Sequence, residues 1–202
     1  DIEALAIHPK TNLIYTASGD DVTNENNGHF YMVDGQTGEL FPVGSTGFNE
    51  IEDLAFSPDG TLWAWVKGDG LITIDLTTGT GHLEIASNAS QVLVEELTLS
   101  KEKDRTVFYG SANTELWVYD MDANTLDVAC TNLFGETKAL EMVSDGLQIL
   151  PAGFLLVATH NVPFGLHAFN PETCEVITAD ETLTNKFKDV EGIALPINAC
   201  AK

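Results

Sequence analysis

Short stretches of alternating apolar and polar residues run along the chain and recur as a four-part phrase. Each phrase opens with an alternating strand, a polar turn and a second strand rich in aromatic and β-branched residues, beginning at Ile2, Ile51, Val94 and Ser144. A third strand then ends at or near an Asp or Asn, and a Thr/Gly/Asn turn leads into a fourth strand; these end residues are Asp34, Asp75, Asp120 and Asn170. We expect the Asp or Asn side chain to bond the backbone of that turn.

Four short antiparallel strands in about 40–50 residues are typical of a β-propeller blade. We therefore predict an all-β chain of about four four-stranded blades in a single propeller domain, or a propeller fragment, over residues 1–202; the blades lie near residues 2–49, 50–88, 92–134 and 144–183. A β-sandwich also uses short alternating strands, but it does not require the same four-strand phrase to recur. The best helical candidate is GETKALEMV (135–143), for one or two turns.

A fifth copy of the first strand, VEGIALP from Val190, predicts one surplus inner strand at residues 189–196. A closed ring needs matched sets of strands, because closure is how propellers protect their edges. We expect either a longer parent propeller, which we favour, or pairing of this strand with another subunit. A start at Asp1 with no apolar leader is likewise expected of a processed protein or an excised piece.

Two stretches carry the most specific form of the phrase, GHFYMVDGQTGELFPVGSTGFNEIEDLAFSPDGTLWAWV and LITIDLTTGTG. They resemble secreted bacterial propellers whose blades read LYxIDxxTGxxxxVGxTGxxxIxxLAFxPDGTLYA, distant relatives of the NHL and lactonase-like propellers. The third phrase departs from that pattern, because Lys101-Glu102-Lys103-Asp104 replaces the Pro-Asp-Gly turn. The resemblance implies a propeller that is secreted or at the cell surface. Members of this group bind, adhere or catalyse, so the resemblance does not select a function.

The charge of the chain is far from balanced. Thirty-one Asp and Glu residues against nine Lys and Arg give a formal net charge of −22. Such a surface repels nucleic acid and anionic membranes, so we predict no nucleic-acid partner. No apolar run approaches the ~20 residues that a membrane-spanning helix needs.

An acidic residue stands two positions before a core Leu or Ile in each first strand; these are Glu3, Glu52, Glu95, Asp145 and Glu191. First strands line the channel of a propeller, so the carboxylates are predicted to form a ring around its axis. Clustered carboxylates raise one another's pKa values unless a cation lies among them, and Ca²⁺ suits such oxygen ligands better than zinc does. The ring is therefore a candidate calcium site, and the alternative is a solvated ring without metal.

Two further stretches look like calcium ligands. The polar loop at residues 19–28 is rich in Asp, Asn and Glu, and its alternative is a plain surface loop. The stretch at 120–124 imitates the start of an EF-hand, but Thr125 and Thr131 replace the Gly and Glu that the motif needs, so we interpret it as a blade turn.

Three cysteines fit neither a disulfide scaffold nor a zinc site. We predict that Cys174 and Cys200 form a disulfide that ties down the tail, and that Cys130 stays free. The sequence contains no GxSxG or HExxH motif, and we interpret His160 and His167 as loop or core residues.

These patterns favour a non-catalytic extracellular propeller used for binding, adhesion or assembly, with a protein or glycan partner and a cation at the channel. Two alternatives stay open. One is a metal-dependent hydrolase of the lactonase or esterase kind that uses the acidic ring, although the sequence places no Asn or His ligands and no general base beside it. The other is a carbohydrate-binding propeller.

Overall fold

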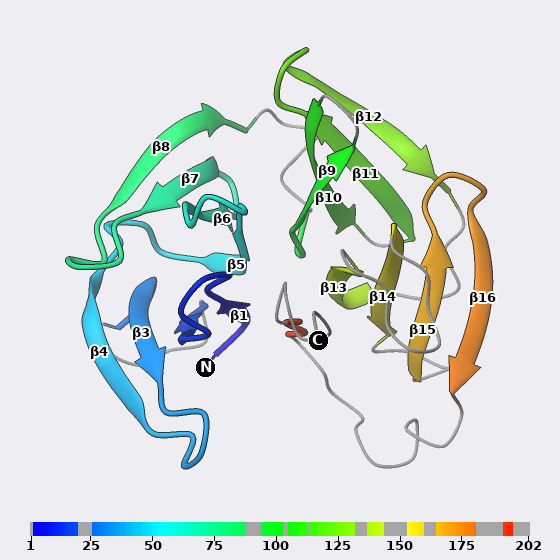
Figure 1. Cartoon of the computed structure of the whole chain (residues 1–202). Helices are drawn as coiled ribbons and strands as arrows, with labels where there is room; N and C mark the ends of the chain where they lie inside the picture. The colour runs from blue at the N-terminus through cyan, green and yellow to red at the C-terminus, as the bar shows by residue number, and fades with distance from the viewer. Residues whose placement is uncertain are drawn as a thin grey trace. The chain divides into compact units, whose positions relative to one another are not determined.

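In a computed structural model, the chain folds into four antiparallel sheets, each built from four consecutive strands (Figure 1). The structure describes residues 2–19, 26–87, 94–102, 105–112, 114–131, 137–143, 153–159, 165–180 and 192–195. No helix occurs in these ranges, and so none that could cross a membrane. Separate sheets of consecutive strands are propeller blades, so the predicted β-propeller is confirmed and the sandwich is excluded.

The strands follow chain order within every sheet. The first sheet contains β1 (Ala4–Ile7), β2 (Ile14–Ala17), β3 (His29–Val33) and β4 (Leu40–Ser45). The second contains β5 (Ile51–Phe56), β6 (Leu62–Val66), β7 (Gly70–Ile74) and β8 (Gly81–Ala86). The third contains β9 (Thr98–Glu102), β10 (Arg105–Ala112), β11 (Glu115–Asp120) and β12 (Thr125–Cys130). The fourth contains β13 (Thr137–Val143), β14 (Phe154–Thr159), β15 (Gly165–Asn170) and β16 (Glu175–Asp180).

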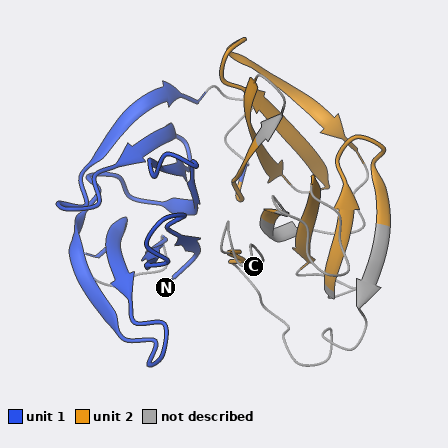
Figure 2. Cartoon of the chain, viewed as in Figure 1, with its two compact units in different colours: residues 1–94 blue, residues 95–202 orange. Residues whose placement is uncertain are grey.

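The chain divides into two compact units of two sheets each, unit 1 (Asp1–Val94) and unit 2 (Glu95–Lys202), coloured separately in Figure 2. In unit 1, Tyr15 stacks on Phe30 of its own sheet, with 5.3 Å between ring centroids, and meets Phe56 of the second sheet at 5.8 Å. In unit 2, Val107 of the third sheet and Leu155 of the fourth lie in one buried cluster. Each unit therefore has an apolar core shared by its two sheets.

The turn after each third strand is closed by one side-chain oxygen. The Oδ1 atom of the Asp or Asn accepts the backbone N–H groups two and three residues further on, at 2.8–3.3 Å, in all four sheets; these residues are Asp34, Asp75, Asp120 and Asn170. The bond expected from the sequence is thus confirmed. The EF-hand-like stretch at 120–124 is this same turn, as interpreted.

The fourth residue after each of these Asp or Asn residues has a left-handed backbone. Its φ is +74° at Gly38, +80° at Gly79, +53° at Asn124 and +61° at Cys174. Glycine adopts this conformation freely and Asn tolerates it, whereas a Cys there is strained. Another interaction must therefore hold Cys174 in place.

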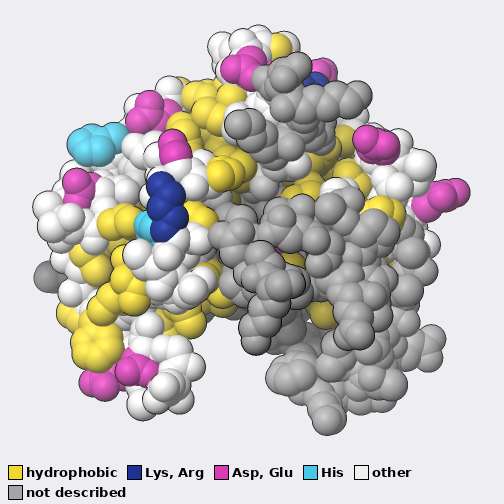
Figure 3. Space-filling model, in the orientation of Figure 1, with side chains coloured by type: hydrophobic (Ala, Val, Ile, Leu, Met, Phe, Trp, Pro, Cys, Tyr) yellow, Lys and Arg dark blue, Asp and Glu magenta, His cyan; other side chains and the backbone are white. Residues whose placement is uncertain are grey.

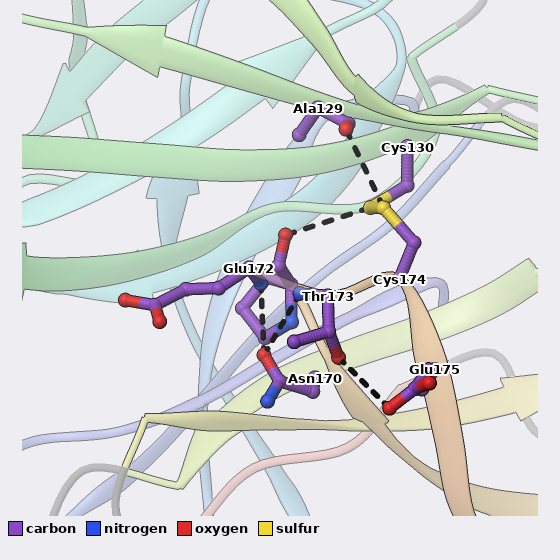
Figure 4. Close-up of a disulfide and its surroundings, with 8 residues drawn as sticks. Ala129, Cys130, Asn170, Glu172, Thr173, Cys174 and Glu175 are labelled. Atoms are coloured by element: carbon purple, nitrogen blue, oxygen red, sulfur yellow. Dashed lines mark hydrogen bonds between the residues drawn. A yellow bond between two sulfur atoms is a disulfide. The ribbon is translucent and has the colours of Figure 1, made fainter.

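That interaction is a disulfide between Cys130, the last residue of β12, and Cys174, in the turn before β16 (Figure 4). Their Cα atoms are 5.7 Å apart. The predicted Cys174–Cys200 pair is therefore wrong, and so is a free Cys130; Cys200 lies outside the described residues. The sequence showed both cysteines near outermost strands but not that adjacent sheets bring these strand ends together.

Unit 1 makes the same contact with glycines. Gly44 holds the place of Cys130. Each pairs with the third-strand residue that directly precedes a register shift, Gly44 with Phe30 and Cys130 with Leu116. Gly79 holds the place of Cys174 in the turn. A Cβ on Gly79 would lie only 3.0 Å from the backbone of Gly44, so these two segments of the backbone are in close contact there. Unit 2 replaces this close backbone approach with a covalent bond.

The fourth sheet begins earlier than expected. Its first strand is β13 (Thr137–Val143), whereas the sequence placed that strand from Ser144. The helical turns predicted for 135–143 are wrong for the same reason, because pairing with β14 makes this segment a strand. Of the expected surplus strand at 189–196, residues 192–195 are described, and no strand is assigned to them.

The disulfide gives a first prediction. Replacing both cysteines (C130A/C174A) should lower the free energy of unfolding by up to about 4 kcal/mol, the chain-entropy value for two residues 44 apart in sequence. Denaturant titration of the oxidised protein measures the loss, and peptide mapping without reductant identifies the pair. A linked peptide that joins Cys174 to Cys200 would contradict the assignment.

A matched variant separates backbone strain from the loss of the crosslink. C130A/C174G also lacks the disulfide, but Gly suits the left-handed position, so it should be about 1 kcal/mol more stable than C130A/C174A. Equal stability of the two variants would show that position 174 carries no such strain.

Candidate functional site

The predicted acidic ring can be placed by strand register. In every sheet the third-strand residue two positions before the recurring turn Asp or Asn pairs with a second-strand residue, which in turn pairs with one first-strand residue. We call it the reference position; its residues are Ala6, Ala55, Thr98 and Glu141. The residues three positions earlier are Glu3, Glu52, Glu95 and Lys138. In the fourth sheet Lys138 therefore holds the position that Glu holds in the other three sheets. The predicted Asp145 comes after the end of β13 in the sequence.

Three of the five predicted residues lie in the part of the chain that the structure describes. The carboxyl group of Glu3 lies against Gly19, in the space that a Cβ there would occupy. Glu95 is partly buried, and its N–H donates to the Ser111 carbonyl at 3.0 Å, as that of Glu3 donates to the Ala17 carbonyl at 3.3 Å. Asp145 and Glu191 fall outside the described residues.

Glu52 is held by a cation of the protein itself. It is the extra residue of a β-bulge between Ile51 and Asp53, and its side chain is only 10% exposed. The ammonium group of Lys67 lies 3.1 Å from Glu52 Oε1 and 2.6 Å from Glu50 Oε1. The three side chains form one ion cluster at the start of β5.

The electrostatics of this cluster follow from burial and pairing. Desolvation raises the pKa of Glu52 to about 7, and the bond and charge of Lys67 only partly oppose that rise. The hydrogen bond to Glu50 raises the pKa of Lys67 above its usual range. Lys67 thus stays charged at neutral pH, and Glu52 keeps its proton to a higher pH than an exposed Glu does.

More deeply buried acids lie one residue further along the chain from Glu52 and Glu95, at positions that the sequence reasoning did not select. Asp53 is 4% exposed, and its Oδ1 accepts the Leu54 N–H at 2.7 Å. Glu96, the corresponding residue of the third sheet, is 2% exposed. The doubled acids in IEDL and VEEL were the available signal, because alternation must turn one of each pair inward.

A further carboxyl group, that of Glu141, lies on β13. Glu141 Oε1 accepts the Thr98 hydroxyl at 3.0 Å and the Met142 N–H at 2.9 Å, and the carboxyl group also accepts the Leu195 N–H. Desolvation raises the pKa of Glu141 to about 7 despite these bonds. The sequence reasoning passed over this residue because it assigned 135–143 to helical turns.

The described residues contain no group of three or more His, Cys, Asp or Glu side chains able to hold a metal. Figure 3 shows the Asp and Glu side chains of one face spread over it rather than gathered in one place. His167 is buried in β15 with Thr159 Oγ1 3.4 Å from its Nε2, which confirms a core residue. His160 and residues 20–25 of the polar loop lie outside the described ranges.

Comparison with known proteins places the chain by fold. No family model matches it, and no curated protein matches it significantly. Hydrazine synthase of Kuenenia stuttgartiensis is 13% identical with a TM-score of 0.54, over 88% of this chain and 48% of that one. A chain of the nidogen/laminin complex is 10% identical with a TM-score of 0.56, over 88% and 79%.

A third solved structure is the extracellular domain of a one-component system from B. thetaiotaomicron. It is 14% identical with a TM-score of 0.50, over 95% of this chain and 24% of that one. The chain thus spans between a quarter and a half of the two bacterial chains that it matches. At such identities the similarity shows the fold alone.

The ion cluster gives a second prediction. Lys67→Met should lower the free energy of unfolding at pH 8 by roughly 1–3 kcal/mol, because it leaves the buried Glu52 carboxylate without its cation. The effect should shrink at pH 5, where Glu52 is protonated. Lys10→Met, the same substitution at an exposed residue, should change stability by less than about 0.5 kcal/mol. Equal effects of the two substitutions would refute a role for the cluster.

The pH dependence gives a third prediction. A carboxyl group whose pKa rises from 4.5 unfolded to about 7 folded keeps its proton longer in the native state, so stability falls as the pH rises from about 4.5 to about 7. Glu141 should contribute up to about 3 kcal/mol to this fall. Thermal unfolding of Glu141→Gln from pH 4.5 to 8 should show a flatter profile than the parent. Parallel profiles would contradict the assignment.

Proposed function

We propose that this chain is a secreted or cell-surface propeller that binds a polypeptide partner without transforming it. The Cys130–Cys174 disulfide supports the compartment, because such bonds persist in oxidising environments. The bacterial domain of similar fold is itself described as extracellular. Both observations agree with the location that the repeat resemblance implies.

The observation that carries the binding role is a pattern on the outermost strands. Each has a large apolar residue that is 40–51% exposed, namely Leu40 on β4, Leu83 on β8, Val128 on β12 and Val176 on β16. An exposed acidic residue directly adjoins each one, namely Glu39, Glu84, Asp127 and Glu175. A partner segment that alternates basic and apolar residues complements both features. The net charge of −22 would also speed its approach.

Other parts of the functional prediction remain predictions. Calcium bound by Glu3, Glu52, Glu95, Asp145 and Glu191 would raise the melting temperature on titration. Adhesion, a glycan partner, strand sharing with another subunit and the hydrolase alternative likewise await experiment. A polypeptide partner is favoured because the outermost strands supply both charge and apolar surface for it.

A fourth prediction tests the proposed partner class. A decapeptide of alternating Lys and Leu should bind by calorimetry, and a Glu–Leu decapeptide should not. The triple variant E84Q/D127N/E175Q should weaken binding of the Lys–Leu peptide at least about tenfold, since those carboxylates adjoin the exposed apolar residues.

The matched control removes the same charge elsewhere. D69N/D122N/E172Q neutralises three exposed acids that do not adjoin these apolar residues, and it should weaken binding only slightly. Equal losses in the two triple variants would show that net charge, not the outermost strands, attracts the peptide, and the proposal would fail.

A further inference from the structure

The first strands of unit 2 are joined by a hydrogen bond that depends on the reference position. Thr98 occupies that position in β9. Its hydroxyl oxygen accepts the N–H of Met142 at 3.0 Å, while its proton goes to Glu141 Oε1. Met142 is the residue directly after the reference position of β13. The side chain at the reference position of one sheet therefore binds the backbone of the next first strand, one residue later.

Glu141 makes a corresponding bond to the segment at residues 192–195. It occupies the reference position of β13, and its carboxyl group accepts the N–H of Leu195. The N–H of Leu195 thus binds the side chain of Glu141 as the N–H of Met142 binds the side chain of Thr98. Counting back one residue gives Ala194 the reference position of its own segment, which matches the small Ala6 and Ala55 of the first two sheets.

The apolar contacts agree with the same superposition. Leu195 packs against the buried Ala168 of the fourth sheet, as Leu156 does. Leu156 pairs with Glu141, and Ala168 pairs in turn with Leu156. In the third sheet the matching residues are Tyr109 and Val118, and they lie in or against the buried cluster that contains Met142. The hydrogen bond and the packing therefore each indicate that residues 192–195 lie beside the fourth sheet as β13 lies beside the third.

We propose that the fourth sheet carries a binding site for the first strand of a fifth blade, and that residues 192–195 occupy it in a register set by Glu141. The segment recognised is extended, with a large apolar, a small and a large apolar residue in succession, as in Ile193-Ala194-Leu195. Glu141 is a positioning residue in this site, and the inference does not depend on the proposed partner.

A carboxylate suits this position because it has more acceptor sites than a hydroxyl. Its two oxygens can accept about four hydrogen bonds, whereas the Thr98 hydroxyl donates one and accepts at most two. Glu141 uses this capacity for the Thr98 hydroxyl and for two backbone N–H groups, those of Met142 and Leu195. One side chain thereby links β9, β13 and the segment at 192–195.

The fifth prediction uses amide hydrogen exchange at single-residue resolution on the full chain. The Leu195 amide should be protected in the parent protein. Glu141→Met, which fills a similar volume without an acceptor, should speed its exchange at least about tenfold, while Glu141→Gln, which keeps a carbonyl acceptor, should have a smaller effect. Thr98→Val is the matched control. It removes one of the two acceptors of the Met142 N–H, Glu141 Oε1 being the other, so it should speed Met142 exchange only slightly and leave Leu195 protected.

Two outcomes would overturn the proposal. One is exchange of the parent Leu195 amide at the rate of an unstructured peptide. The other is unchanged Leu195 protection in Glu141→Met while that variant remains folded. If Glu141→Met does not fold, Leu195→Ser supplies the test, because it keeps the N–H but loses the apolar contact with Ala168 and should also speed exchange.

Discussion

The Asx turn after each third strand sets the geometry on which the outer half of every sheet depends. One Oδ1 atom accepts two backbone N–H groups and so fixes the path into the outermost strand. The turn requires a left-handed residue four positions after the Asp or Asn. In the second and fourth sheets that residue, Gly79 or Cys174, also lies against the outermost strand of the preceding sheet in the same unit, so it shapes both a hairpin and the contact between two sheets.

That requirement explains why glycine holds this turn position in the second sheet, whereas the cysteine of the fourth sheet is crosslinked there. Gly79 permits the left-handed turn and leaves room for the backbone of Gly44. Cys174 does not favour that conformation, but its bond to Cys130 offsets the cost and crosslinks the two sheets of unit 2. The first solution relies on close backbone packing, and the second relies on an oxidising compartment.

The sequence predicted the strands and turns well because both depend on local signals. Alternation and the recurring Asp or Asn lie within a few residues of the elements that they define. The first strand of the fourth sheet was missed because Lys138, Ala139, Leu140, Glu141 and Met142 all favour helices in isolation, and only pairing with β14 overrides that preference. The disulfide was missed because its pairing depends on which strand ends adjacent sheets bring together.

The candidate site shows the same limit. Acids at blade spacing were visible in the sequence, and a cation site and a solvated ring were both open interpretations of them. The sequence did not show that Glu52 lies beside Lys67, or that hydroxyl and N–H donors surround Glu141, which is not one of those acids. With nine Lys and Arg against 31 acids, most carboxylates have no protein cation available, so those that are buried depend on hydrogen-bond donors or protonation.

Two classes of carboxyl group make the stability of the fold depend on pH in opposite directions. The turn N–H groups, those of Thr37, Thr78 and Ala123 foremost, hold the pKa values of Asp34, Asp75 and Asp120 below the ordinary 3.8, so their contribution is lost as the pH falls through their folded pKa values. Glu52 and Glu141, with pKa values raised to about 7 by desolvation, weaken the fold as the pH rises above about 4.5. Self-repulsion of an acidic surface also grows in that direction. These three effects together place maximum stability on the acidic side of neutrality, above the range in which the turns lose their carboxylates.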